Sequence, residues 1–159
     1  MAADIKQKFG TATTITVTLA SLADAAKRES TVVDNTSDLF LDAHVQIKVK
    51  SGASVSGDKA VYVYAYASLD SSSPGYSGEA TGSDAAYTGT LTNAKMIGIV
   101  SCPAATTSYI SDLMSIAAAF GGSVPTKWGI IVENKTGAAL DSTEANHVKK
   151  YIGILVQSL

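Results

Sequence analysis

The sequence predicts an all-β protein, a two-sheet β-sandwich with jelly-roll or related Greek-key topology. Residues 39–50 alternate apolar and polar side chains strictly, residues 59–69 repeat the alternation, and no segment has the apolar period of a long helix. A period of two fits a strand with one face on a buried core. Without helices between the strands, a parallel sheet with crossover helices is excluded.

The N-terminal third predicts an arm followed by short elements. Residues 1–10 are polar and are expected to form an N-terminal arm, whereas residues 11–159 are expected to form a single sandwich domain. Residues 13–19 alternate threonine with aliphatic side chains and predict the first strand. Residues 20–30 are rich in alanine, and we expect one or two helical turns there, whereas residues 31–34 predict a brief strand that ends in a turn.

Two long strands follow, and a hairpin is the natural connection between them. Residues 39–50 place leucine, alanine, valine and isoleucine on one face and charged or amide side chains on the other. After a loop rich in serine and glycine, residues 59–69 place Tyr62, Tyr64 and Tyr66 on one face and valine or alanine on the other. The three tyrosines should therefore form a row.

The middle of the chain carries fewer structural signals. Residues 70–93 consist mainly of serine, glycine, threonine, aspartate and alanine, so they predict a long loop, with a hidden edge hairpin as the alternative. Residues 95–102 predict a strand that ends before Pro103. Residues 106–120 have an ambiguous period, and we predict a strand there, although residues 116–120 also suit a helix.

The C-terminal third is clearer. Residues 128–133 predict a strand with Trp128 in the core, residues 134–137 a tight turn, and residues 147–156 the last strand. The total is about eight strands separated by turn signals, which is typical of a sandwich.

Composition limits the functions to consider. The chain has 159 residues, enough for one self-sufficient core, and 16% of them are charged. The average is about 25%, so the surface should be neutral and suited to contact with other proteins. The net charge of −2 is scattered, which argues against nucleic acid or an anionic membrane as a partner. The single cysteine, Cys102, excludes an internal disulfide, and no apolar run suggests a signal peptide or a membrane span, so synthesis in the cytoplasm is expected.

The sequence offers no catalytic constellation. His44 and His147 are its only histidines, and no Gly-x-Ser-x-Gly motif occurs. No short ligand spacing joins the histidines and Cys102, so neither a metal nor another cofactor is expected. The carboxylates on turns are single rather than paired. We therefore expect a protein without enzymatic activity.

The tyrosine row is the candidate binding feature. Tyr62, Tyr64 and Tyr66 have the spacing of a protein interface, because tyrosine combines a rigid aromatic body with a polar tip. Two other interpretations stay open: ordinary packing on the sheet, and a platform on which a sugar stacks.

Two segments, residues 118–140 (AAFGGSVPTKWGIIVENKTGAAL) and residues 33–42 (VDNTSDLFLD), resemble small virion structural proteins of tailed bacteriophages and prophages. The resemblance implies a multicopy virion component, most often a capsid decoration or cement protein that binds and stabilises the head shell. The alternative is a tail, neck or fibre component, including a carbohydrate-binding module.

This resemblance also implies partners and a location. The partners would be the major capsid protein or other virion proteins, together with further copies of the chain in a homo-oligomer, for which a trimer is favoured. The protein would be made in the bacterial host cytoplasm and end in the virion.

Overall fold

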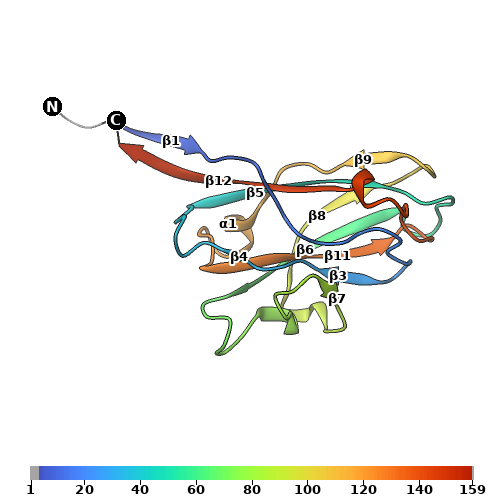
Figure 1. Cartoon of the computed structure of the whole chain (residues 1–159), viewed down its shortest axis with the longest axis horizontal. Coiled ribbons are helices and arrows are strands. Elements are labelled where there is room, and N and C mark those ends of the chain that lie inside the picture. Colours follow the sequence, from blue (N-terminus) through green and yellow to red (C-terminus); the bar gives the residue numbers. More distant parts are fainter. Residues whose placement is uncertain (1–3, 159) are drawn as a thin grey trace.

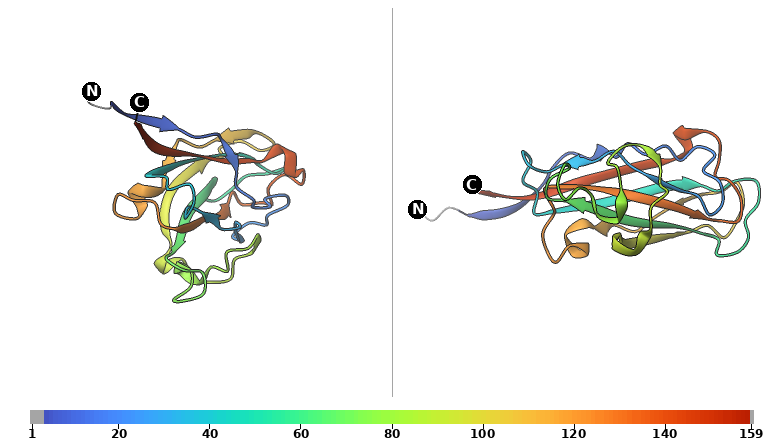
Figure 2. Two further views of the ribbon diagram at one scale, coloured as in Figure 1. Left: turned by 60° about the vertical axis from the view of Figure 1, so that its left-hand side comes forward. Right: turned by 90° about the horizontal axis from the view of Figure 1, so that it is seen from below.

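The structure is a β-sandwich of two antiparallel six-stranded sheets, which confirms the predicted fold class (Figure 1). It is a computed structural model and describes residues 4–158. The two sheets, called sheet A and sheet B below, pack face to face, and loops join them at both ends of the sandwich (Figure 2).

Sheet A contains the first and the last strand of the chain. Its strands lie in the order β1 (Ile5–Phe9), β12 (Val148–Ser158), β5 (Asp42–Lys50) and β10 (Met114–Ser115), with β2 (Thr13–Thr14) beside β12 and β9 (Ser108–Ile110) beside β5. The long β12 carries the sheet, because it pairs with β1 at its outer end and with β5 along the body.

Sheet B is built around β11 and β6. Its order is β7 (Ala85–Ala86), β3 (Lys27–Glu29), β11 (Lys127–Lys135), β6 (Ala60–Ser68) and β8 (Lys95–Ser101), and β4 (Val33–Asp34) also pairs with β11. The helices are α1 (Ile116–Ala119) and three short 3-10 helices, Ser77–Glu79, Leu91–Asn93 and Glu144–Asn146.

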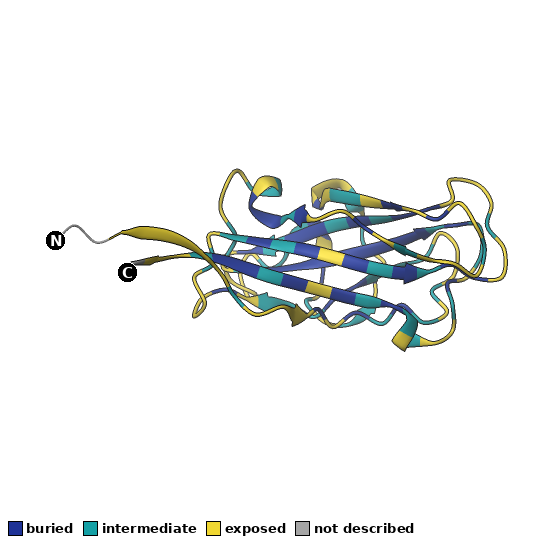
Figure 3. Ribbon diagram, turned by 90° about the horizontal axis from the view of Figure 1, so that it is seen from above, coloured by how far each residue is buried: buried dark blue, intermediate teal, exposed yellow. Residues whose placement is uncertain are grey.

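The core lies between the sheets and uses the alternation that the sequence shows. The inward faces of β5, β6 and β11 supply most of it, and Figure 3 shows buried and more exposed residues alternating along the strands. The buried residues are Ala43, Val45, Ile47 and Val49 from β5, Val61, Val63 and Ala65 from β6, and Trp128, Ile130 and Val132 from β11. Trp128 is fully buried and meets Tyr151 of β12 edge to face, with ring centroids 5.2 Å apart. This contact joins the two sheets.

The burial of Trp128 makes its fluorescence a direct test of the fold. We expect native emission at a shorter wavelength than that of free indole, because no part of the side chain is exposed to water. Unfolding in urea should move the emission to longer wavelength. An emission maximum that is the same in the native and unfolded protein would contradict this position of Trp128.

The expected hairpin between residues 39–50 and 59–69 is wrong. These segments form β5 and β6, which belong to different sheets: β5 pairs with β12, and β6 pairs with β11 and β8. The connection between them crosses the end of the sandwich, where the Ser51 amide donates to Thr107 O (3.0 Å) and the Ser56 amide to Thr136 O (2.7 Å). Side-chain alternation fixes the buried face of a strand and does not choose its partner.

The first predicted strand and the predicted helical corner also differ from the structure. Only Thr13–Thr14 of residues 13–19 is in a ladder, although Ile15, Val17 and Leu19 are buried as expected. Here the backbone amides donate to side chains instead of to the carbonyls of a neighbouring strand. The Thr18 amide donates to Asp84, and the Leu19 amide donates to Glu144. Residues 20–30 form turns and β3 instead of helix.

Two further boundaries are corrected. Residues 39–41 precede β5, and Leu39 and Leu41 are exposed rather than buried, because Leu39 adopts a left-handed backbone (φ 53°) that ends the alternation. Residues 106–120 are divided into β9, β10 and α1 instead of one strand. Ser115 caps α1 by accepting a hydrogen bond from the Ala118 amide, which starts the helix in the alanine run.

Half of the expected arm, residues 5–9, belongs to sheet A. Residues 5–9 form β1 and pair with residues 154–158 of β12, and Figure 1 shows the two strands projecting together from the body. The first three residues of the expected arm lie outside the described residues. We call residues 5–9 and 154–158 the terminal ribbon.

Candidate functional site

The predicted tyrosine row lies on the outer face of sheet B, away from the core. The β6–β11 register places Tyr62 opposite Glu133, Tyr64 opposite Ile131 and Tyr66 opposite Gly129. The three rings therefore share one face, as the alternation predicts. Their surroundings differ, however, because another part of the chain covers one end of this face.

Residues 70–94, called the cover segment below, pack on the outer face of sheet B (Figure 2). They bury Tyr66 and Ile131 in a second, smaller apolar cluster that includes Tyr87. The segment expected to be a loop thus protects part of the sheet. Its β7 pairs with β3, so part of the alternative expectation, an edge strand within it, is met.

Tyr66 is fully buried beneath the cover segment. Its hydroxyl donates to Ser30 O (2.7 Å), and its ring meets Tyr76 edge to face at 5.5 Å. Gly129 stands opposite because a Cβ there would collide with the Tyr66 ring. Burial raises the pKa of Tyr66 far above its usual value. In this chain Tyr66 is a packing residue without access to a partner.

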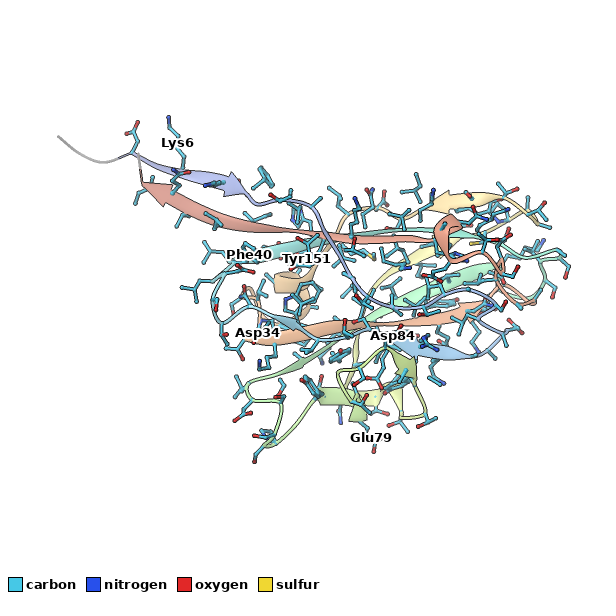
Figure 4. All side chains as sticks on the ribbon, viewed as in Figure 1. Lys6, Asp34, Phe40, Glu79, Asp84 and Tyr151 are labelled. Atoms are coloured by element: carbon cyan, nitrogen blue, oxygen red, sulfur yellow. The ribbon has the colours of Figure 1, made fainter. Side chains whose placement is uncertain are left out.

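Charged side chains hold the cover segment in place. Asp84 accepts hydrogen bonds from Arg28 Nε (2.6 Å) and from the hydroxyl of Thr18 (2.6 Å), and Figure 4 labels it at the contact with the body. Burial opposes the charge on Asp84, but these donors outweigh it and lower the pKa of the carboxyl. Buried Glu29 accepts from the amide and the hydroxyl of Thr81 (2.7 and 3.0 Å).

Tyr62 and Tyr64 remain partly accessible and adjoin exposed aliphatic side chains of β8. The β6–β8 register places Ile99 opposite Tyr62 and Met96 opposite Tyr64. Met96 is 57% exposed and Ile99 is 49% exposed. Tyr62, Tyr64, Met96 and Ile99 form the β8 patch, an apolar surface at the edge of sheet B.

The hydroxyls at the β8 patch are weakly engaged. Tyr64 donates to Glu133 Oε2 at 3.2 Å, and Tyr62 reaches Asp58 Oδ2 at 3.4 Å. An apolar surface with a few polar tips has the character of a protein interface core. The sequence indicates the tyrosines but not their aliphatic neighbours, because the pairing of β6 with β8 sets those.

The terminal ribbon is the second candidate surface. The β1–β12 register places Ile5, Phe9, Ile154 and Val156 on one face, and Lys6 and Lys8 lie on the other. Ile5 is 75% exposed and Phe9 is 55% exposed, although both are large and apolar. Figure 4 shows Lys6 pointing away from the ribbon into solvent.

A hollow of about 430 Å³ lies at the base of the terminal ribbon, on the outer face of sheet A. Ile154 and Val156 of β12 line it together with Ala117 of α1 and Gly122. Asp42 and His44 of β5 also line it, with His44 Nε2 3.3 Å from Asp42 Oδ2. Asp42 is occupied structurally, because it accepts from the Ser115 hydroxyl (2.8 Å) and the Ala117 amide (2.9 Å).

The groups considered for catalysis or metal binding lie apart. His44 is in the hollow, whereas His147 is buried, with Nδ1 accepting from the Lys50 amide (3.3 Å). Cys102 is also buried, and burial raises the pKa of its thiol to about 11, which makes it a poor nucleophile. Within residues 4–158, no three His, Cys, Asp or Glu side chains are grouped to hold a metal ion. No helix in this range is long and apolar enough to cross a membrane.

Comparisons with protein-family models, with curated proteins and with solved structures returned no match.

Proposed function

We propose that the chain is a structural subunit of a tailed-phage virion, a capsid decoration or cement protein without enzymatic activity. The resemblance of residues 33–42 and 118–140 to such proteins suggests the class. The proposed way of binding rests on the terminal ribbon, because the ribbon extends beyond the body and exposes apolar side chains. The proposed partner of the ribbon is the major capsid protein.

The ribbon has features of an element that is completed by a partner. A two-stranded ribbon is marginally stable alone in water, and an exposed face with Ile5 and Phe9 gains stability when it is buried. The outer edge of β1 also offers unpaired peptide groups to a neighbouring strand. Lys6 and Lys8 on the opposite face favour an acidic rim on the partner.

The proposal is tested by locating the chain in particles of the phage or prophage that encodes it. Cryo-electron microscopy should show many copies on the head lattice, with the terminal ribbon against the shell. Copies confined to the tail or neck, or particles without the chain, would overturn the proposal. A glycan bound with micromolar affinity, together with absence from the shell, would favour the fibre alternative.

Variants test the role of the ribbon. Deleting residues 1–9, or changing Phe9 to Asp, should lower occupancy of the shell at least about tenfold, equivalent to about 1.4 kcal/mol of binding. Circular dichroism should stay that of the native sandwich, because residues 5–9 are all exposed. Leu69→Asp is the matched control, since Leu69 is 80% exposed and lies outside the ribbon. Full occupancy by the deletion variant would exclude the ribbon as the contact.

A further inference from the structure

The outer edge of β8 is open. β8 is the last strand of sheet B and pairs with β6 alone among the described strands. The Cys102 amide donates to Lys59 O (2.7 Å), so the alternation of an antiparallel ladder turns the peptide groups of Ile99 and Ser101 outward. In residues 4–158 no side chain or loop is hydrogen-bonded to those two outward-facing groups.

The other edges are short or charged. β7 and β10 have two residues each and β9 has three, whereas β1 carries Lys6 and Lys8. Short edge strands and charged side chains protect natural sheets, because an open apolar edge pairs with other strands. β8 has seven residues and one charge, Lys95, at its first position. Its ladder with β6 has a register shift at Val63 and Tyr64, but residues 98–101 beyond that shift carry neither a charge nor a bulge.

Two apolar surfaces adjoin this edge. The β8 patch lies on the outer face of sheet B. The second surface is a groove of about 240 Å³, which exposed Leu113 lines with Ile97, Ala118 and Met96 of the patch. A strand added at β8 would cover both apolar surfaces while it satisfies the open peptide groups.

We propose that β8 pairs with β8 of a second copy of this chain, antiparallel and about a two-fold axis. The two sheets B would then form one continuous sheet. An isologous contact requires a surface that matches itself. The edge of β8 matches itself because antiparallel pairing places the two Lys95 side chains at opposite ends of the contact. The β8 patches of the two copies then lie side by side.

This inference is independent of the virion proposal and differs from the trimer expected from the sequence. When two β8 edges pair with each other, the open peptide groups of both copies are hydrogen-bonded. A third copy therefore cannot join through the same edge. The predicted unit is a dimer, or a larger assembly made of such dimers.

The first test measures association of the purified chain. Analytical ultracentrifugation should show a dimer that dissociates on dilution. Ile99→Lys should raise the dissociation constant at least about tenfold, because a charge would be placed in the contact. Leu39→Lys is the matched control, since it adds the same charge to an exposed aliphatic position outside both β8 and the terminal ribbon. A protein that stays monomeric up to about 1 mM, a stable trimer, or a dimer disrupted by Leu39→Lys alone would overturn the inference.

The second test needs no variant and reads the backbone directly. Hydrogen exchange at the amides of Ile99 and Ser101 should slow as the protein concentration rises through the dimerisation range, while exchange at β1 stays unchanged. Fast exchange of both amides in the associated protein would show that another surface mediates association.

Discussion

Changing Trp128 to alanine should lower the free energy of unfolding by about 3–5 kcal/mol, the largest single-residue loss that we expect in this chain. Trp128 is the largest fully buried side chain and contacts both sheets, through its place in β11 and through Tyr151 of β12. The strands on either side are fixed by ladders, so the cavity cannot collapse easily. Urea unfolding followed by circular dichroism measures the loss.

Two variants provide the comparison. Trp128→Phe should cost clearly less than alanine, because it keeps an aromatic ring and removes the buried indole N–H, which has no acceptor in the described part of the chain. Leu69→Ala should change stability by less than about 0.5 kcal/mol, since that side chain is largely exposed. If Trp128→Ala cost no more than Leu69→Ala, the contact between the sheets would not depend on this residue.

The second large effect is expected at Glu29. Replacing it with alanine removes the acceptor of both the Thr81 hydroxyl and the Thr81 amide, and hydrogen bonds to a charged group contribute about 1.5–3 kcal/mol. We expect the cover segment to open more often while the sandwich stays folded. If the free energy that holds the segment closed falls by about 2 kcal/mol, cleavage by a protease within residues 70–94 should accelerate roughly thirtyfold, because the cleavage rate follows the population of the open form.

The control is Asp58→Ala, which removes an exposed carboxylate whose one hydrogen bond within residues 4–158 comes from the Tyr62 hydroxyl. It should leave the cleavage rate within about twofold of the parent, since surface changes alter stability by less than about 0.5 kcal/mol. Equal cleavage of the Glu29→Ala protein and the parent would mean that Asp84 and the apolar cluster hold the segment without Glu29.

The sequence predicted those features that depend on neighbouring residues. The alternation in β5 and β6 identified their buried faces, and Trp128 lies in the core as expected. The neighbour of each strand in its sheet could not be predicted in this way, because such neighbours are often distant in the sequence. Tyr64, for example, pairs with Met96, which lies more than thirty residues further along the chain. The hairpin expected between β5 and β6 failed for this reason.

The candidate site shows the same division. Alternation placed Tyr62, Tyr64 and Tyr66 on one face, which is correct. It could not show that Tyr66 is covered, because residues 70–94 have the composition of a loop and are ordered by distant acceptors such as Glu29. Pairing of β1 with β12 was equally hidden, since it joins the two ends of the chain.

The terminal ribbon has a mechanical consequence. Ile5 is paired with Ser158 at its tip, so a force that separates the two ends acts on one rung of the ladder at a time, as in opening a zipper. The five rungs would yield in sequence at low force, down to the bond from the Gly10 amide to Gly153 O (2.8 Å). Below that point β12 is held by β5, and the load reaches strands that are clamped by the core. The ribbon should therefore peel apart under tension and close again without unfolding the sandwich. In the virion role proposed above, this opening would let the subunit follow a lattice that changes its spacing.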